Sequence, residues 1–291
     1  MRKIDINVFS WIGVLGILLR KHSPWFLLLT LFFLLAFLPK NNEQKDKKYR
    51  EFYKTEFLSN FNPYILFQVI KQVFGELYLR IIKTNKVQTV NKYILPFKEK
   101  WLVANGGTNK ENSHSWELIT QRYAYDFVIH NEEGITYSDN KSNIQNYFCF
   151  GIPIISSFKG KVIAINNKTR DYNKVGDFSV DWKTNNIAGN YIIIEHPNNE
   201  YSFYAHLKKD TIIVKVNDIV EKGQEIALCG NSGRSTEPHL HFQVMNSQNF
   251  FFGKSLIISF ENTLNLNGEK VEFIEKEMVV KNTTATNISY T

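Results

Sequence analysis

Two histidines stand one residue apart at the end of the stretch GNSGRSTEPHLHFQV, residues 230–244. Successive side chains of a β-strand point to opposite faces, so His239 and His241 share one face and Leu240 points to the other. Neutral imidazole is a good zinc ligand, and a metal is the commonest reason to hold two such rings together. The pair alone is a weak signal. The glycines and the proline before it, however, indicate a turn that fixes the direction in which the strand begins.

A carboxylate lies inside an apolar stretch, QRYAYDFVI, at Asp126. A carboxylate in such surroundings must be paired or bound to a metal, so Asp126 is a candidate ligand on chemical grounds alone. The other histidines have plainer interpretations. His206 ends the apolar run YSFYAHL and would by itself be a histidine at the edge of the core, and His196 after YIIIE needs no chemistry.

The elements that position these residues are predicted to be strands. From about residue 92 the chain consists of short β-branched or aromatic runs such as GKVIAIN, NYIIIEH and QEIALCG. Gly, Asn, Asp and Pro separate them at about the 8–12-residue spacing of antiparallel all-β folds. We expect a mainly β domain, an antiparallel sandwich or compact barrel. Cys149 and Cys229, without CxxC spacing, are expected to be small core residues.

An apolar run of fourteen residues, WFLLLTLFFLLAFL, covers residues 25–38. As a helix it rises about 21 Å against a hydrocarbon core of about 30 Å, which is typical of a signal-peptide core or a short membrane anchor. No clear cleavage site follows, which favours an uncleaved anchor, and the basic residues upstream predict that residues beyond 40 lie outside the cytoplasm. A second apolar run, residues 8–19, allows a two-helix hairpin instead and leaves the orientation open.

Residues 40–50, KNNEQKDKKYR, are expected to be a charged linker beside the membrane. Residues 63–83 then place apolar side chains at helical spacing, with Asn62 as N-cap and Pro63 in the first turn. We expect an amphipathic helix that packs on the domain, with a helix lying on the membrane as the alternative.

The formal net charge of +7 suits an anionic surface such as lipid headgroups or cell-wall polymer, and it equally suits simple solubility. No run combines basic and aromatic residues as a nucleic-acid-binding stripe does, so nucleic acid is not an expected partner.

The stretch GNSGRSTEPHLHFQV, together with YIIIEHPNNEYSFYAHL and VNDIVEKGQEIALCG before it, resembles the lysostaphin-type zinc metallopeptidases. The likeness covers roughly residues 120–246, with weaker support from about 92. It implies the duplicated hybrid motif fold and an endopeptidase that cuts the cross-links or stem peptides of peptidoglycan. It also implies one Zn²⁺ per chain, held by a histidine, an aspartate and the second histidine of the HxH pair.

Carried over by position, the aspartate is Asp126 and the last ligand is His241. The first ligand departs from the family pattern, because the position four residues before Asp126 is Arg122, whose guanidinium cannot bind a metal. His114, twelve residues before Asp126, is the preferred candidate, and His130 is the alternative.

The resemblance also implies that His206 and His239 are catalytic residues that flank a metal-activated water without binding the metal. Such a pair orients or deprotonates the water, protonates the leaving amine and stabilises the oxyanion. Which histidine does which is left open. Glu237 is expected to be a rim residue that shapes access for the substrate.

The expected organisation is an anchor or signal region at 1–40, a linker and helix at 41–91, a peptidase domain at 92–275 and a polar tail at 276–291. We expect a membrane-anchored bacterial endopeptidase acting outside the cytoplasm, or a secreted one if the N-terminal segment is cleaved. The alternative is a catalytically weak or inactive module that binds the wall and regulates other hydrolases. A third possibility is a different peptide or protein substrate on the same fold.

Overall fold

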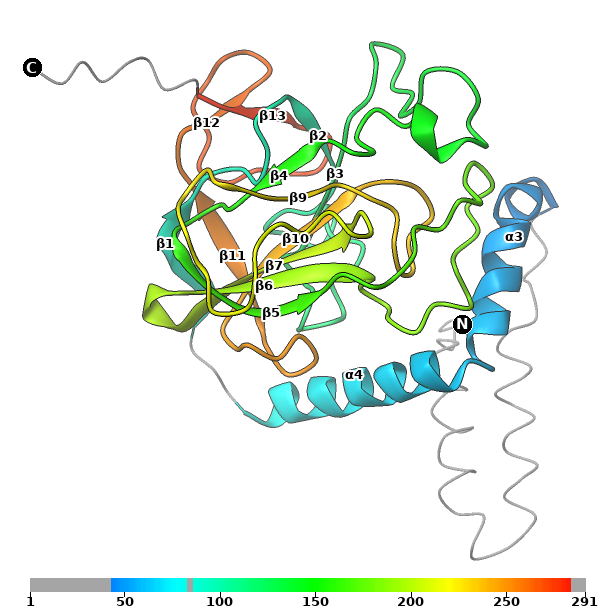
Figure 1. Cartoon of the computed structure of the whole chain (residues 1–291), viewed down its shortest axis with the longest axis horizontal. Coiled ribbons are helices and arrows are strands. Elements are labelled where there is room, and N and C mark those ends of the chain that lie inside the picture. Colours follow the sequence, from blue (N-terminus) through cyan, green and yellow to red (C-terminus); the bar gives the residue numbers. More distant parts are fainter. Residues whose placement is uncertain (1–42, 83–85, 284–291) are drawn as a thin grey trace, which may run out of the picture. The chain divides into compact units, whose positions relative to one another are not determined.

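The computed structural model describes residues 43–82 and 86–283 (Figure 1). The chain divides into two compact units, Met1–Arg50 and Glu51–Thr291. The described part of the first unit, residues 43–50, is the beginning of helix α3 (Glu43–Ser59). The apolar runs at 8–19 and 25–38 lie outside the described residues. Within the described ranges, no helix is both long and apolar enough to cross a bilayer.

The helix predicted for residues 63–83 is confirmed as α4 (Pro63–Ile81). Its start has the expected chemistry, because the side chain of Asn62 accepts a hydrogen bond from Tyr64 N and Pro63 fills the first turn. Helix α3 occupies most of the segment that was expected to be a charged linker. Its Glu, Gln, Lys and Arg residues are good helix formers, so a highly charged segment is compatible with a helix.

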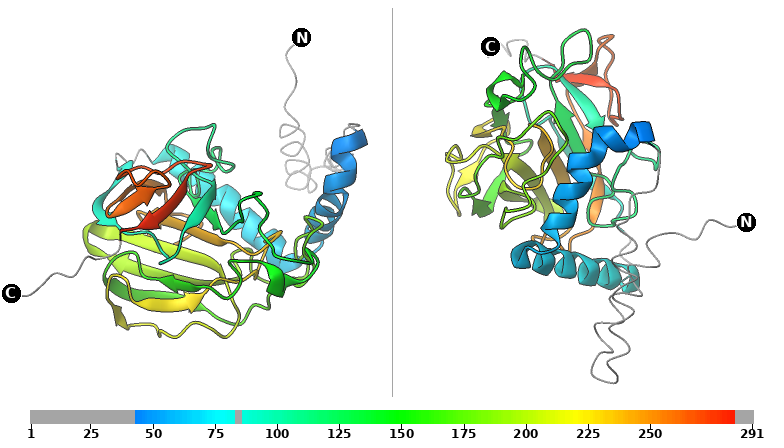
Figure 2. Two further views of the ribbon diagram at one scale, coloured as in Figure 1. Left: turned by 90° about the horizontal axis from the view of Figure 1, so that it is seen from above. Right: turned by 90° about the vertical axis from the view of Figure 1, so that its right-hand side faces the viewer.

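The second unit is built mainly from strands, and Figure 2 shows the longest of them running side by side. Their bounds are β1 Gln88–Tyr93, β2 Trp101–Asn105, β3 Tyr125–Val128, β4 Pro153–Ile155, β5 Gly160–Asn166, β6 Asn190–His196, β7 Glu200–Leu207, β8 Ile219–Val220, β9 Glu225–Leu228, β10 Leu240–Met245, β11 Ser255–Phe260, β12 Thr263–Asn265 and β13 Val279–Asn282. Two short 3-10 helices, η2 Ile144–Asn146 and η3 Pro197–Asn199, complete the set.

In the described part of the chain, eleven strands form one sheet in the order β12-β13-β2-β3-β10-β7-β6-β5-β8, with β11 between β10 and β1. The pairing of β1 with β11 is parallel, whereas β10 pairs antiparallel with β3, β7 and β11. Strands β4 and β9 form a second, two-stranded sheet. The expectation of a mainly antiparallel β domain is therefore confirmed.

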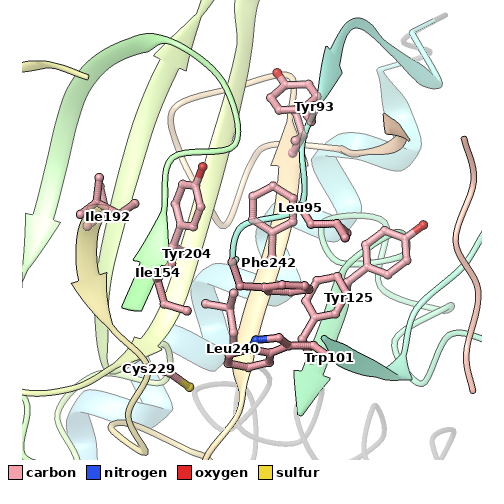
Figure 3. Packing of buried hydrophobic residues seen from close by; sticks show 14 of the residues in the cluster. Tyr93, Leu95, Trp101, Tyr125, Ile154, Ile192, Tyr204, Cys229, Leu240 and Phe242 are labelled. Carbon is pink, nitrogen blue, oxygen red and sulfur yellow. The ribbon is translucent and has the colours of Figure 1, made fainter. Parts of the chain in front are cut away.

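The main core lies on one face of the sheet. Leu240 and Phe242 of β10 point into it beside Tyr204 of β7 and Tyr125 of β3, all almost fully buried (Figure 3). The residues between them in sequence, such as His241, therefore point to the opposite face. That opposite face carries a smaller apolar cluster, which includes Phe203, Ala205 and Met245.

Two details of the fold bear on the sequence-based expectations. Cys149 and Cys229 are free and buried, as expected of core residues. Strand β13 lies inside the range expected to be a polar tail, and it pairs with β2 and β12. The side chain of Asn282 explains why order extends this far, because it hydrogen-bonds to the backbone of Leu95 and Phe97.

Candidate active site

Strand β10 lies between the strands that carry the other candidate residues. Its His241 stands opposite Asp126 of β3 on one side and opposite Ala205 of β7 on the other. Asp126 and His241 lie on the face of the sheet opposite the main core. His206 follows Ala205, and its ring centre lies 6.0 Å from that of His241, so three adjacent strands bring a carboxylate and two imidazoles together.

Asp126 is the point on which the candidate ligands converge. His241 Nδ1 lies 3.0 Å from Asp126 Oδ1, and His114 Nδ1 lies 3.4 Å from Asp126 Oδ2. His239 Nε2 approaches Asp126 Oδ1 at 3.7 Å. The structure therefore brings together His114, Asp126, His239 and His241, which are separated by up to 127 positions in sequence.

The loop before β3 brings His114 to Asp126, and Arg122 holds that loop. Arg122 Nε donates to the backbone oxygen of Trp116 at 2.8 Å, and Ser113 Oγ donates to the backbone oxygen of Arg122 at 2.8 Å. The guanidinium also lies 5.1 Å from the centre of the Trp116 ring. Arg122, which stands where the family pattern has a histidine, therefore stabilises the loop that carries His114.

His130, the alternative first ligand, follows β3 by two residues. Its Nδ1 lies 2.6 Å from the backbone oxygen of Asn131. Among the described residues, the imidazoles paired with Asp126 are those of His114, His239 and His241. His114 is thus paired with Asp126, whereas the ring of His130 contacts the backbone of Asn131.

The two histidines expected to be catalytic form a pair, with ring centres 4.7 Å apart. His206 Nδ1 donates to the backbone oxygen of Ser232 at 2.8 Å, and His239 Nδ1 donates to the backbone oxygen of Glu237 at 2.9 Å. A carbonyl oxygen can only accept, so each Nδ1 carries the proton in the neutral ring and each Nε2 keeps a lone pair. His206 adopts a positive φ of 59°, a sparsely populated conformation that is common at functional sites.

The glycine-containing turn before β10 packs tightly against the end of β7 and the start of β6. Gly233 has φ 81°, and a Cβ there would lie 2.4 Å from Gly189 N. Arg234 N donates to the backbone oxygen of Ile187 in the same region. This close approach supports the expectation that the turn aims the HxH strand.

The electrostatics of the site follow from its burial. Burial alone would raise the pKa of Asp126, but the hydrogen bond from His241 and the charges of His239 and His114 lower it well below its usual range. Burial, followed by repulsion from His239 and His241, lowers the pKa of His206 to about 3. Burial raises the pKa of Glu237, which accepts a hydrogen bond from Thr136 Oγ1.

The side chains around Asp126 are of the types that bind zinc. Two ligands about 2.0–2.1 Å from one tetrahedral zinc lie about 3.3–3.4 Å apart, close to the distances of 3.0 and 3.4 Å from Asp126 to His241 and His114. Across residues 43–82 and 86–283, however, no three His, Cys, Asp or Glu side chains form a complete metal-binding group. The residue types and these two distances from Asp126 are compatible with a zinc ion.

A groove of about 520 Å³ lies on the same face of the sheet as His241. Phe203, which lines it, has its ring centre 6.1 Å from that of His241. Its walls include aromatic and amide side chains and one cation, namely Tyr191, Phe250, Asn186, Asn249, Gln248 and Lys71. The groove is lined by none of the five candidate site residues and adjoins the site through Phe203.

Two residues beside the site were missed by sequence reasoning. Asn105 of β2 donates to Asp126 Oδ2 at 3.3 Å, and Gln243 Oε1 accepts from His241 Nε2 at 3.2 Å. The period of the strand offered a signal for Gln243, because residue i+2 shares the face of His241. For Asn105 the signal was absent, since its position depends on the pairing of β2 with β3.

Comparisons with known proteins identify part of the chain. Residues 147–251, about a third of the chain, match the sequence model of Peptidase family M23. The matched range contains His206, His239 and His241, whereas His114 and Asp126 lie before it.

Curated relatives match over short stretches. Peptidoglycan DD-endopeptidase ShyB of Vibrio cholerae is 39% identical over 95 residues, which cover 33% of this chain and 18% of ShyB. Murein hydrolase activator NlpD of Escherichia coli is 34% identical over 94 residues, which cover 32% of this chain and 20% of NlpD. The chain thus spans a fifth or less of the length of these two relatives.

Among solved structures, a zinc-containing peptidase from Vibrio cholerae is similar, with 27% identity and a TM-score of 0.34. The similarity covers 57% of this chain and 41% of that one.

Proposed function

We propose that the protein is a zinc-dependent endopeptidase that hydrolyses peptide bonds of peptidoglycan. The observation that carries the proposal is the convergence on Asp126 of His114, His239 and His241. His114 and Asp126 lie before the range that matches Peptidase family M23, yet the fold brings them next to His239 and His241 inside that range. Similarity to ShyB, named as a peptidoglycan DD-endopeptidase, supports this substrate class.

The proposed ligands are His114, Asp126 and His241, on the duplicated hybrid motif fold. A zinc ion held there supplies a Lewis acid that lowers the pKa of water from 15.7 towards about 7 and polarises a carbonyl oxygen. Asn105, which donates to Asp126 Oδ2, holds the carboxylate in a fixed orientation. The low pKa of Asp126 keeps that carboxylate ionised at neutral pH.

The histidine pair handles protons in this proposal. His206 and His239 each donate through Nδ1 to a backbone oxygen, so each keeps an unprotonated Nε2 with its lone pair. One such nitrogen accepts a proton from the attacking water, and the resulting imidazolium gives a proton to the leaving amine. The groove beside Phe203 binds the substrate peptide on either side of the scissile bond.

The location proposed for this activity is the outer side of the cytoplasmic membrane, with residues 25–38 as the anchor. The motivation is the apolar run and the basic residues upstream of it. Fractionation of cells with protease protection of the intact chain tests this location.

An alternative function is that of a regulator of other wall hydrolases. It is favoured by the similarity to NlpD, named as a murein hydrolase activator, and by the lack of a complete metal-binding group in the described residues. An activator of this kind needs neither zinc nor turnover.

The test is digestion of purified sacculi by the full chain, followed by mass spectrometry of the released fragments. We expect peptide cross-links or stems to be cut, with activity reduced by about 10²–10⁴-fold in His206→Ala and His239→Ala, the range typical of lost acid–base catalysis. Zinc content should remain near one per chain in both variants. Intact sacculi and a zinc-free wild-type chain would favour the regulatory function.

A further inference from the structure

Helix α4 has a second apolar face, opposite the face that packs on the sheet unit. Ile65, Gly75, Glu76 and Leu79 are buried on the inner side. At helical spacing on the outer side lies a set of exposed side chains that we name the outer stripe, namely Leu66, Phe67, Ile70, Phe74, Leu77 and Ile81. Their exposed fractions run from 43% at Ile70 to 81% at Ile81.

The charges around the outer stripe point to a lipid surface. The exposed charged residues of α4 are both basic, Lys71 and Arg80, and its one acidic residue, Glu76, is buried on the inner side. Lys71 Nζ lies 4.5 Å from the centre of the Phe67 ring, so a cation stands at the border of the stripe. An apolar face with aromatic residues and flanking cations is typical of helices that lie in the headgroup region of anionic membranes.

The sequence upstream of α4 gives an independent reason to expect a lipid surface against the outer stripe. The apolar run at residues 25–38 has the composition of a membrane segment, and 24 residues, 39–62, separate it from Pro63. A chain of that length keeps α4 within reach of the bilayer surface. We infer that the outer stripe of α4 lies in the interface of the membrane, so that the sheet unit is held at the lipid surface.

The test uses the full chain in vesicles of phosphatidylglycerol and phosphatidylethanolamine, with a bimane label on Ile70→Cys. Cys149 and Cys229 are buried, so the label goes to the introduced thiol. Ile213→Cys is the matched control, because Ile213 is 69% exposed on the sheet unit. We expect doxyl-labelled lipid to quench position 70 at least about twofold, as for a side chain inside the headgroup region, and to leave position 213 unchanged.

Phe74→Glu in the chain labelled at position 70 should reduce that quenching, and Leu77→Cys offers a second labelling site if the first variant folds poorly. An unquenched label at both stripe positions would overturn the inference. If the bimane emission is blue-shifted but not quenched, the outer stripe packs against another protein surface instead. That surface is a second copy of this chain if the shift disappears on dilution. These outcomes do not depend on peptidase activity.

The inner face of α4 leads to a separate inference, which rests on the proposed function. Glu76 is 8% exposed, and its Oε2 accepts from Ile119 N at 2.8 Å. Its Oε1 accepts from Thr120 N at 3.1 Å and from Thr120 Oγ1 at 3.0 Å. Gly75 permits this contact, because a Cβ there would lie 1.7 Å from Phe251 O.

The same segment is connected to His241 through Gln243. Gln243 Nε2 donates to the backbone oxygen of Thr120 at 3.0 Å, which leaves Gln243 Oε1 to face His241 Nε2 at 3.2 Å. An amide oxygen only accepts, so the Gln243 contact keeps a proton on His241 Nε2. Nδ1, which faces Asp126 Oδ1 at 3.0 Å, is then the nitrogen that would give up its hydrogen bond to Asp126 for a metal. The geometry points to Glu76 and Gln243 as positioning residues that fix the ring of His241 and hold its Nε2 proton, so that Nδ1 faces the proposed metal site.

The readout is zinc affinity of the full chain, measured by competition with a chromophoric chelator, together with the ¹⁵N shifts of the His241 ring. We expect Gln243→Leu and Glu76→Ala to weaken zinc binding by about 10–100-fold, the usual effect of losing an outer hydrogen bond to a ligand. Glu76→Gln, which keeps one acceptor oxygen, should recover part of the loss. Lys71→Ala, on the exposed side of the same helix, should bind zinc as the wild type does.

A lower melting temperature with unchanged zinc affinity and unchanged ¹⁵N shifts would overturn the positioning role. A wild-type chain that binds no zinc would instead refute the proposed function. In that case the ¹⁵N shifts of the metal-free protein still decide whether Gln243 fixes the protonated nitrogen of His241.

Discussion

At the scale of single residues, the candidate site depends on one carboxylate that several imidazoles share. Asp126 would be costly to bury alone, and its environment supplies a hydrogen bond from His241 and one from Asn105. His114 differs from the other two histidines near Asp126, because its side chain is 47% exposed. Among the proposed ligands it is therefore the one whose position depends most on its loop.

The assignment of His114 leads to the first prediction. His114→Ala should weaken zinc binding by more than about 100-fold, because removing a ligand costs more than removing an outer partner. The matched control is His130→Ala, whose ring contacts the backbone of Asn131 and should leave zinc binding unchanged. Both are measured by metal analysis after dialysis against a chelator. Zinc lost from His130→Ala and kept in His114→Ala would reverse the assignment.

At the scale of helices and strands, the sequence predicted the features that are determined by residues close together in the chain. Helix α4 follows from its cap and periodicity, and the shared face of His239 and His241 follows from strand alternation. Asp126 was recognised as a buried carboxylate before its strand neighbours were known. In each case the information lies within a few residues of the feature itself.

Features that depend on pairing between distant segments were missed. The contact between Asn105 and Asp126 exists because β2 pairs with β3 through an irregular register. The role of Arg122 as a loop brace, and the path from Glu76 to Gln243, require knowing which loop packs on which helix. For Glu76 a signal existed, since a lone acid on the apolar side of a helix must find buried partners.

The second prediction concerns β6, which ends at the buried His196. Its Nδ1 lies 2.8 Å from Lys159 O and its Nε2 lies 2.7 Å from Ser202 Oγ, so it links β6 to β7 and to the residue just before β5. Burial lowers the pKa of His196 from 6.5 to about 4. As the pH falls from 6.5 to 4 the unfolded chain binds a proton that the folded chain does not, so the folded state loses stability by about 3 kcal/mol.

Urea unfolding of the full chain at pH 7 and at pH 4.5 measures this loss. His196→Asn should be less stable than the wild type at pH 7, but its stability should fall less between the two pH values. Equal falls in both proteins would contradict the assignment, because the other titrating groups are the same in both.

At the scale of the whole molecule, the proposed ligands join parts that are far apart in the chain. His114 comes from the loop before β3, Asp126 from β3 and His241 from β10, and β10 is central to the eleven-stranded sheet of the described residues. The unfolded chain cannot hold the three together, so a metal that binds all of them stabilises only the folded state.

The third prediction follows from this coupling. Zinc at 100 times its dissociation constant should stabilise the folded full chain by about 2.7 kcal/mol and raise the melting temperature, and a chelator should reverse the effect. Asp126→Asn should abolish the zinc-dependent shift, because the carboxylate is the group that the histidines share. Calorimetry with and without zinc measures both. His130→Ala should keep the full shift, since its ring lies outside the proposed ligand set. A shift that survives in Asp126→Asn would mean that zinc stabilises the fold from a different place.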